Sequence, residues 1–254
     1  MNLGDLLAEL RENILNDRTD RVSGTSDYLW TDATLTRYIN EAQRRFAVRG
    51  LVLRDGSTPE ATQVTMVANQ GQYVLHPSVI AVVSAQISGR VVDLPRVGHS
   101  FLNMYRQPEE QWYDAGYLSA LPPGEIRCYG TDEEVTADDS GSLSVVNMRV
   151  YPVPDTTFAG STVQLRVIRK PMDPLSSPSD VPEIPEDHHL NMLDWAAFLA
   201  LRMVDNDDVT NMARAADFSN RFEAHVQEAR NEVMRRLYAP QPWGFGRGGF
   251  SWEH

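Results

Sequence analysis

Histidines beside acidic residues are the first place in this sequence where chemistry could occur. His188 and His189 follow Asp187 and precede Asp194, a set of residue types that can bind a transition metal. Adjacent residues on a helix point about 100° apart, whereas two histidines that share a metal on one helix are spaced i, i+4. The spacing therefore favours solvated histidines at the start of a helix over a metal site.

A second acidic group, Asp205 to Asp208, has part of the pattern of a calcium-binding loop. Such a loop needs glycine at its sixth position and glutamate at its twelfth. Thr210 and Ala216 stand at those positions when Asp205 is counted first. Helix capping by short acidic side chains explains these residues better than calcium binding does.

Motifs for nucleophilic catalysis and phosphate binding are missing from the sequence. It contains neither a glycine-rich phosphate loop nor a nucleophile elbow. The single cysteine, Cys128, lies in a predicted strand and is interpreted as a small buried residue. The acidic run 132–139 is interpreted as a solvated hairpin tip. We therefore expect no enzyme activity, no cofactor and no bound metal. A hydrolase that uses acids of the middle segment is the weakest alternative, since no spacing supports it.

The net charge of the chain limits the kinds of partner that it can bind. The chain has 254 residues, a net charge of −12 and one cysteine. Proteins that hold nucleic acid by neutralising phosphates need clusters of lysine and arginine, so this balance argues against that function. It does not exclude a protein through which DNA passes without sticking. We expect no membrane partner, because the most apolar stretch, 190–204, is too short to span a bilayer.

Four helical segments are expected to position the binding surfaces. Residues 3–16 and 32–50 have apolar residues at helical spacing, and 190–204 is apolar around most of its circumference, which predicts a buried helix. A longer helix follows, and its expected buried face consists of Val209, Met212, Ala216, Ser219, Val226, Val233 and Leu237. The expected bundle core consists of Leu35, Ile39, Phe46, Leu190, Leu193, Trp195, Ala197 and Leu201.

Local signals set the expected ends of these elements. Thr31 or Asp32 caps the second helix, Gly50 terminates it, and Pro185 takes the first helical position of the apolar helix. Ser88-Gly89 predicts a tight turn between strands at 79–87 and 90–94, and a short helix is expected around 101–105.

From residue 62 to 170 the apolar period is two, which predicts about seven short strands. The fold class is therefore α+β, a four-helix bundle with an inserted antiparallel β-sandwich or barrel-like domain. Residues 1–55 and 183–238 form the expected discontinuous helical bundle domain, 56–182 the inserted β domain, and 239–254 an extended C-terminal tail.

The tail combines glycines with aromatic residues and has no means of building its own core. Two interpretations stand: the tail is disordered, or its rings fill pockets on a partner, as aromatic anchors do at interfaces. The anchors would be Trp243, Phe245, Phe250 and Trp252.

The helical segments resemble a known family. Residues 3–11 (LGDLLAELR), a polar loop containing Asp17, and residues 30–43 (WTDATLTRYINEAQ) resemble the N-terminal helices of head-to-tail adaptor (connector) proteins of tailed bacteriophages. The C-terminal pair is similar too, with an acidic start, an apolar helix, an Asp-rich turn and an Ala-rich helix. The large β segment looks more like the short-tailed-phage adaptor or tail-tubular type.

The resemblance implies a structural virion protein at the head-tail junction, assembled in the host cytoplasm. It implies a ring of identical copies, a dodecamer, that docks on the portal protein, extends the DNA channel and carries the next tail component, a nozzle or tail tube. Double-stranded DNA would pass through the lumen without sequence-specific binding. The resemblance also implies that the C-terminal segment reaches the portal, with Arg247 adding a polar contact to the four aromatic anchors.

Ring contacts need complementary patches on neighbouring copies. The arginine-bearing face of the second helix, with Arg37, Arg44 and Arg45, is the candidate inter-subunit surface. The alternative is that these are ordinary solvated charges.

A different function remains open for the middle segment. It could be a binding module that recognises another tail protein or a host surface glycan, with Trp112, Tyr113 and Tyr117 exposed. Burial of these rings in the β core is the competing interpretation.

Overall fold

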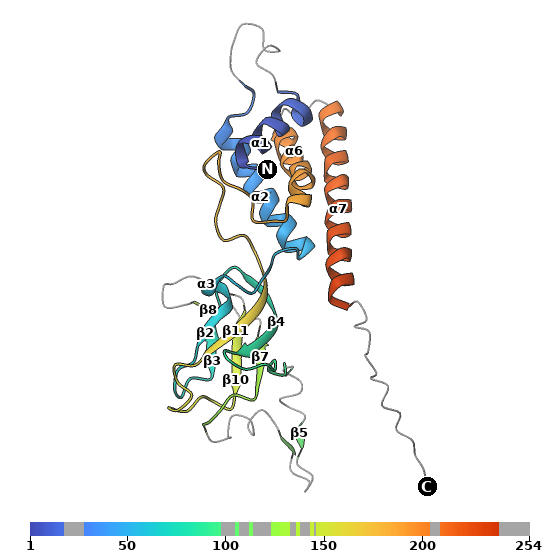
Figure 1. Ribbon diagram of the computed structural model, residues 1–254. Coiled ribbons are helices and arrows are strands. Elements are labelled where there is room, and N and C mark those ends of the chain that lie inside the picture. The colour runs from blue at the N-terminus through green and yellow to red at the C-terminus, as the bar shows by residue number, and fades with distance from the viewer. Residues whose placement is uncertain are drawn as a thin grey trace, which may run out of the picture.

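The computed structural model describes residues 1–17, 28–97, 105–106, 112–113, 123–132, 136–137, 143–144, 146–203 and 209–238. The fold is α+β: N- and C-terminal helices pack together at one end, and two small antiparallel sheets lie at the other (Figure 1). The helical elements are α1 (Leu3–Glu9), the π-helical η1 (Leu10–Leu15), α2 (Asp32–Gly50), α3 (Pro59–Thr62), the 3-10 turn η2 (Glu186–His188), α6 (His189–Met203) and α7 (Val209–Tyr238). None of these helices is both long and apolar enough to cross a membrane.

Side chains cap the first two helices. Asn2 and Asp5 form a reciprocal capping box at α1, with 2.8 Å from the Asp5 amide to Asn2 Oδ1. Thr31 caps α2, as predicted. Gly50 is the last helical residue, and the left-handed position after it belongs to Leu51, whose φ is 56°. The prediction of a glycine terminator is therefore wrong in detail. A Cβ at Gly50 would lie 3.2 Å from Val52 Cγ1, a tight contact.

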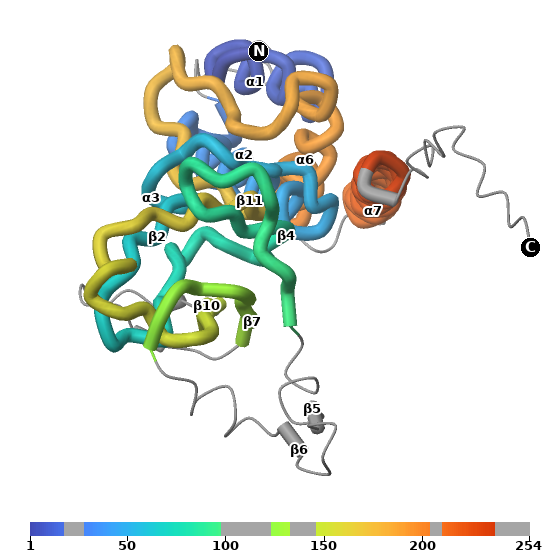
Figure 2. The backbone as a smooth tube through the Cα atoms, turned by 60° about the horizontal axis from the view of Figure 1, so that its bottom comes forward, coloured from blue at the N-terminus to red at the C-terminus, as the bar shows by residue number. Residues whose placement is uncertain are grey.

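The terminal helices share one core, in which α6 lies between α2 and α7 (Figures 1 and 2). Seven of the eight expected core side chains are buried there. The prediction is wrong for Leu190, which is 52% exposed. Leu190 stands in the first turn of α6, and helical spacing gives the face of a side chain but not whether a neighbouring element reaches that turn. The buried seven are Leu35, Ile39, Phe46, Leu193, Trp195, Ala197 and Leu201.

The buried face of α7 agrees with the predicted one only in part. Val226 and Val233 are buried, as predicted. Met212 is 57% exposed and Ala216 is exposed too. Phe218 and Phe222 lie in the core instead, and the Phe222 ring is 5.8 Å from that of Phe46. Large aromatic side chains bury more apolar area than alanine, so they decide which face turns inward.

The sheets are antiparallel and have their own core. One has the order β1-β11-β2 with β4 also paired to β11, and the other has the order β3-β10-β7. Alternate residues Val163, Leu165 and Val167 of β11 are buried, as the period of two predicts. The strands of these sheets are β1 (Arg54–Asp55), β2 (Gln63–Thr65), β3 (Gln72–Val74), β4 (Val79–Ile87), β7 (Cys128–Asp132), β10 (Asn147–Tyr151) and β11 (Thr162–Arg169).

Two short ribbons complete the strands: β5 (Tyr105–Arg106) pairs with β6 (Trp112–Tyr113), and β8 (Thr136–Ala137) with β9 (Leu143–Ser144). Tyr105 is thus in a strand, which corrects the helix expected there, while 101–104 lie outside the described residues. The turn at Ser88-Gly89 is present, with φ 84° at Gly89. The strand expected at 90–94 is reduced to one bridge, Gln86 to Asp93.

Candidate functional site

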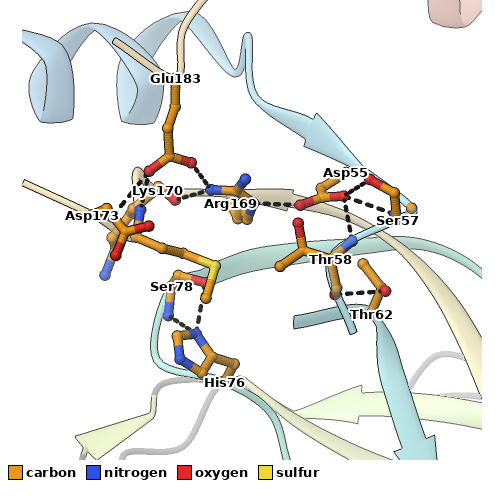
Figure 3. A network of polar contacts seen from close by, with 12 residues as sticks. Asp55, Ser57, Thr58, Thr62, His76, Ser78, Arg169, Lys170, Asp173 and Glu183 are labelled. Atoms are coloured by element: carbon orange, nitrogen blue, oxygen red, sulfur yellow. Dashed lines mark hydrogen bonds and ion pairs between the residues drawn. The ribbon is translucent and has the colours of Figure 1, made fainter. Parts of the chain in front are cut away.

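The chain passes between the helices and the sheets twice, just after α2 and just after β11. One side chain links the two crossings: the Arg169 guanidinium lies between two carboxylates (Figure 3). Arg169 Nε donates to Asp55 Oδ2 at 2.6 Å, and Nη1 donates to Glu183 and to the Lys170 carbonyl oxygen. Asp55 is the last residue of β1, directly after the first crossing, and Glu183 lies in the second crossing, so Arg169 ties the two together.

Backbone donors satisfy the remaining oxygens of both acids. Asp55 Oδ1 accepts from the amides of Ser57 and Thr58 at 2.8 and 3.1 Å. Glu183 Oε1 accepts from the amides of Met172 and Asp173 at 2.6 and 3.0 Å. The Arg169 side chain is only 11% exposed. This is the arrangement that a buried ion pair needs to offset its desolvation.

The network keeps its charges at neutral pH. Burial acts to raise the pKa of Asp55, but hydrogen bonds from Thr58, Ser57 and Arg169 outweigh it and hold that pKa well below its usual range. Burial acts to lower the pKa of Arg169, and its bonds to Glu183 and Asp55 outweigh this and raise it. A charged, directional contact therefore joins the two crossings.

The expectations from the sequence did not include this joint, although a signal for it exists. Arg169 continues the inward series of Val163, Leu165 and Val167 on β11. An arginine at a position where alternation calls for an apolar residue needs a buried acidic partner. Its partners lie 114 and 14 residues away along the chain, so the sequence pattern alone does not identify them.

The second crossing, predicted as an extended linker, is bound to the helices. The Asn40 side chain of α2 makes two bonds to the backbone of Leu175: Nδ2 donates to its carbonyl at 2.9 Å, and Oδ1 accepts from its amide at 2.8 Å. The amides of Leu3 and Gly4 donate to the carbonyls of Asp180 and Pro178 at 2.7 and 2.9 Å. The linker is therefore a structural part of the helical end.

A buried arginine also closes the N-terminal loop. Arg11 contacts Asp17 at 3.1 Å and Asp32 at 2.5 Å, and its guanidinium lies 4.0 Å from the centre of the Tyr28 ring. Asp17 additionally accepts from the Leu29 amide at 2.9 Å. Arg11, Asp17 and Asp32 all belong to the segments that resemble adaptor proteins, and here they have a structural role.

Two of the three candidate inter-subunit arginines have partners within the chain. Arg44 makes a bidentate contact with Glu41, at 2.9 and 3.0 Å. Arg45 lies 3.7 Å from the centre of the Trp195 ring and 4.0 Å from Glu223 of α7. Arg37 is exposed, with its guanidinium 5.6 Å from the Tyr38 ring. The three arginines do not form one common site.

The histidines are not the solvated pair that was expected. His189 is buried, and its Nε2 is 2.9 Å from the carbonyl oxygen of Ile184. The half-buried His188 ring lies 5.1 Å from that of Phe46, and burial lowers its pKa. Helix α6 also begins later than expected, because Pro185 precedes a 3-10 turn. Among the described residues, no group of three or more His, Cys, Asp or Glu side chains has the geometry to hold a metal.

Cys128 begins β7 and is half-buried rather than fully buried, with Sγ 3.9 Å from the Tyr151 carbonyl oxygen. Burial raises the pKa of its thiol. The acidic turn 204–208 and the five tail residues Trp243, Phe245, Arg247, Phe250 and Trp252 lie outside the described residues, so their predicted roles remain predictions.

A family model now identifies the class of protein. The model of the SU10 adaptor protein family matches residues 1–243. The chain belongs to this family. It is a phage head-tail adaptor protein, a structural component of the virion and not an enzyme. A search among curated proteins finds no match. The resemblance of the N-terminal motif to adaptor proteins is therefore confirmed. In this protein, Arg11, Asp17 and Asp32 of that motif form a buried ionic network.

Proposed function

We propose that this SU10-type adaptor assembles into a ring, a dodecamer, that docks on the portal protein, extends the DNA channel and provides the platform for the next tail component. The family match over residues 1–243 is the observation that carries the proposal. The net charge of −12 supports it, because an acidic lining would not retain a passing polyanion.

In this proposal the two ends of the molecule have different tasks. Residues 1–55 and 183–238 act as a four-helix bundle, and 56–182 act as an inserted sandwich-like β domain. The separate cores of the helices and the sheets support this division. Arg37 is the candidate inter-subunit contact on α2. Arg44 and Arg45 already contact Glu41 and Glu223 of their own chain, so they could contact a neighbouring copy only in addition to these acids.

The C-terminal tail is the proposed portal anchor. Helix α7 ends at Tyr238, and sixteen residues follow it in the sequence. Fully extended, a segment of that length reaches about 50 Å, enough to cross onto a neighbouring protein. Aromatic side chains on such a segment gain their energy by filling pockets on the partner, which compensates the ordering of a glycine-rich chain.

Electron microscopy of purified protein mixed with portal rings tests the proposal. We expect added density beneath the portal. Replacing Trp243, Phe245, Phe250 and Trp252 with serine should abolish it while leaving the far-ultraviolet circular dichroism unchanged. The matched control replaces Gly244, Gly246, Gly248 and Gly249 with serine and should still dock. Portal rings that stay bare with the wild-type protein would reject the adaptor ring, and normal docking of the aromatic variant would reject the tail anchor.

A further inference from the structure

Two arginines on the outer face of the larger sheet stand apart from the charge pairs of the β part. Arg54 of β1 is opposite Ile168 of β11, and Arg166 of β11 is opposite Ser84 of β4. Because faces alternate along a strand, Arg54 and Arg166 project from the same side of the sheet, away from the core face. Both side chains are exposed.

The pair flanks a shallow pocket of about 280 Å³, lined also by Asp55, Gly56, Val83 and Val167. The Asp55 carboxylate is already bound to Arg169. Val83, 37% exposed, supplies an apolar wall. An open hollow with two guanidinium groups and one apolar wall suits a small acidic segment.

Neither arginine has a carboxylate partner within the described residues, whereas three other arginines of the β part do. Arg90 pairs with Glu125, Arg149 with Asp132, and Arg169 with its two acids. Two guanidinium groups without an internal acid are therefore available to an external one.

The same chain contains an acidic segment of opposite charge. Glu133, Glu134, Asp138 and Asp139 fall within seven residues, just after β7. Strand β7 belongs to the smaller sheet, whereas Arg54 and Arg166 belong to the larger one. A contact between these two different patches on successive copies is heterologous, and such a contact generates a ring when the rotation between copies closes.

We propose that the pocket between Arg54 and Arg166 receives the acidic segment 133–139 of a second copy of this chain. The proposal rests on the proposed ring. It accounts for how copies that each carry a net charge of −12 can lie side by side: each contact sets the excess acid of one copy against the free cations of the next. Duplex DNA is a poorer occupant, because phosphate-binding surfaces need larger basic clusters and the chain as a whole repels a polyanion.

Charge reversal and its compensation test the contact. Rings on the portal are counted by electron microscopy for the wild-type protein, R54E/R166E, D138K/D139K, and the four-fold combination of these. Each double reversal should reduce ring formation at least about fivefold, because it places like charges opposite each other. The combination should recover most of it. The conservative variant R54K/R166K keeps the charge and should form rings at close to the wild-type level.

The possible outcomes separate this contact from the ring itself. If the wild-type protein forms no rings, the proposed function fails first. If rings form and R54E/R166E forms them equally well, the contact is wrong although the ring stands. Failure of the combined variant to recover, with both double variants folded by circular dichroism, also overturns it. A titration with labelled duplex DNA, followed by fluorescence anisotropy, tests DNA as the alternative occupant of the pocket. If the wild-type protein binds DNA, R54E/R166E does not, and R54E/R166E still forms rings, then the pocket binds nucleic acid and not a second copy.

Discussion

Removing the Arg169 guanidinium should uncouple the two ends of the molecule. In R169M the side chain keeps most of its length but loses its charge and its bonds to Asp55, Glu183 and the Lys170 carbonyl. Breaking one member of a buried ionic group typically costs about 3–5 kcal/mol. Both acids keep two backbone amide donors, so we expect the lower end of that range, about 3 kcal/mol of unfolding free energy.

Urea denaturation followed by circular dichroism measures this loss. With a slope of about 3 kcal/mol per molar, typical for a chain of this size, the midpoint should fall by about 1 M. Arg166 provides a matched control, since it lies on the same strand but is exposed and has no acidic partner within the described residues. R166M should stay within about 0.5 kcal/mol of the wild type.

Two further measurements probe the cause. The triple variant R169M/D55N/E183Q removes all three charges and should recover much of the loss, because no carboxylate is then left buried without a cation. Lowering the pH should reduce the free energy of unfolding of the wild type more than that of R169M. The folded pKa of Asp55 lies below its unfolded value of about 3.9, so its contribution is present above that value and disappears as the pH falls through the folded pKa. An R169M protein as stable as the wild type, or an R166M protein equally destabilised, would refute the reasoning.

Three smaller predictions follow from other contacts. N40A removes both bonds to Leu175 and should cost about 1–3 kcal/mol, with faster exchange of the Leu175 amide. Burial raises the pKa of Asp194 despite the 2.7 Å contact with Arg221, so stability should fall as the pH rises from about 3.9 to the folded pKa. D194N should lack this fall and be no less stable at pH 7, and a clear loss in a thermal melt there would show that the Arg221 contact outweighs burial. Cys128, whose thiol pKa is raised by burial, should react with iodoacetamide at pH 8 more slowly than free cysteine.

The spacing of apolar residues and the capping residues predicted the elements whose structure depends on nearby residues. The α+β class, the apolar helix α6 and the alternating strands β10 and β11 follow from the spacing of their apolar residues. The predicted face of α7 was right for Val226 and Val233 and wrong for Met212 and Ala216. It weighted regular spacing over side-chain size and so left out Phe218 and Phe222. The prediction for Leu190 was wrong because helical spacing does not show how far the neighbouring helices extend along α6.

The joint depends on contacts between distant parts of the chain. Arg169 on an inward position of β11 indicates a buried acid somewhere, but Asp55 is one of many acids in the sequence. The same holds for Asn40, whose partner is the backbone of Leu175 and therefore carries no side-chain signature at all. A polar contact to a backbone group depends on where the fold places that group. The sequence identifies only the side-chain partner.

The chemistry of the joint suits an adaptor better than an apolar contact would. Burial of apolar surface is non-directional, so it holds two bodies together without fixing the rotation between them. Charge-assisted bonds from a planar guanidinium have defined directions, and those of Arg169 reach both crossings of the chain. A ring of identical copies closes only when every subunit repeats the same rotation. We therefore expect that weakening the joint leaves the helical core folded, with its own buried residues intact, and impairs ring closure before it impairs folding.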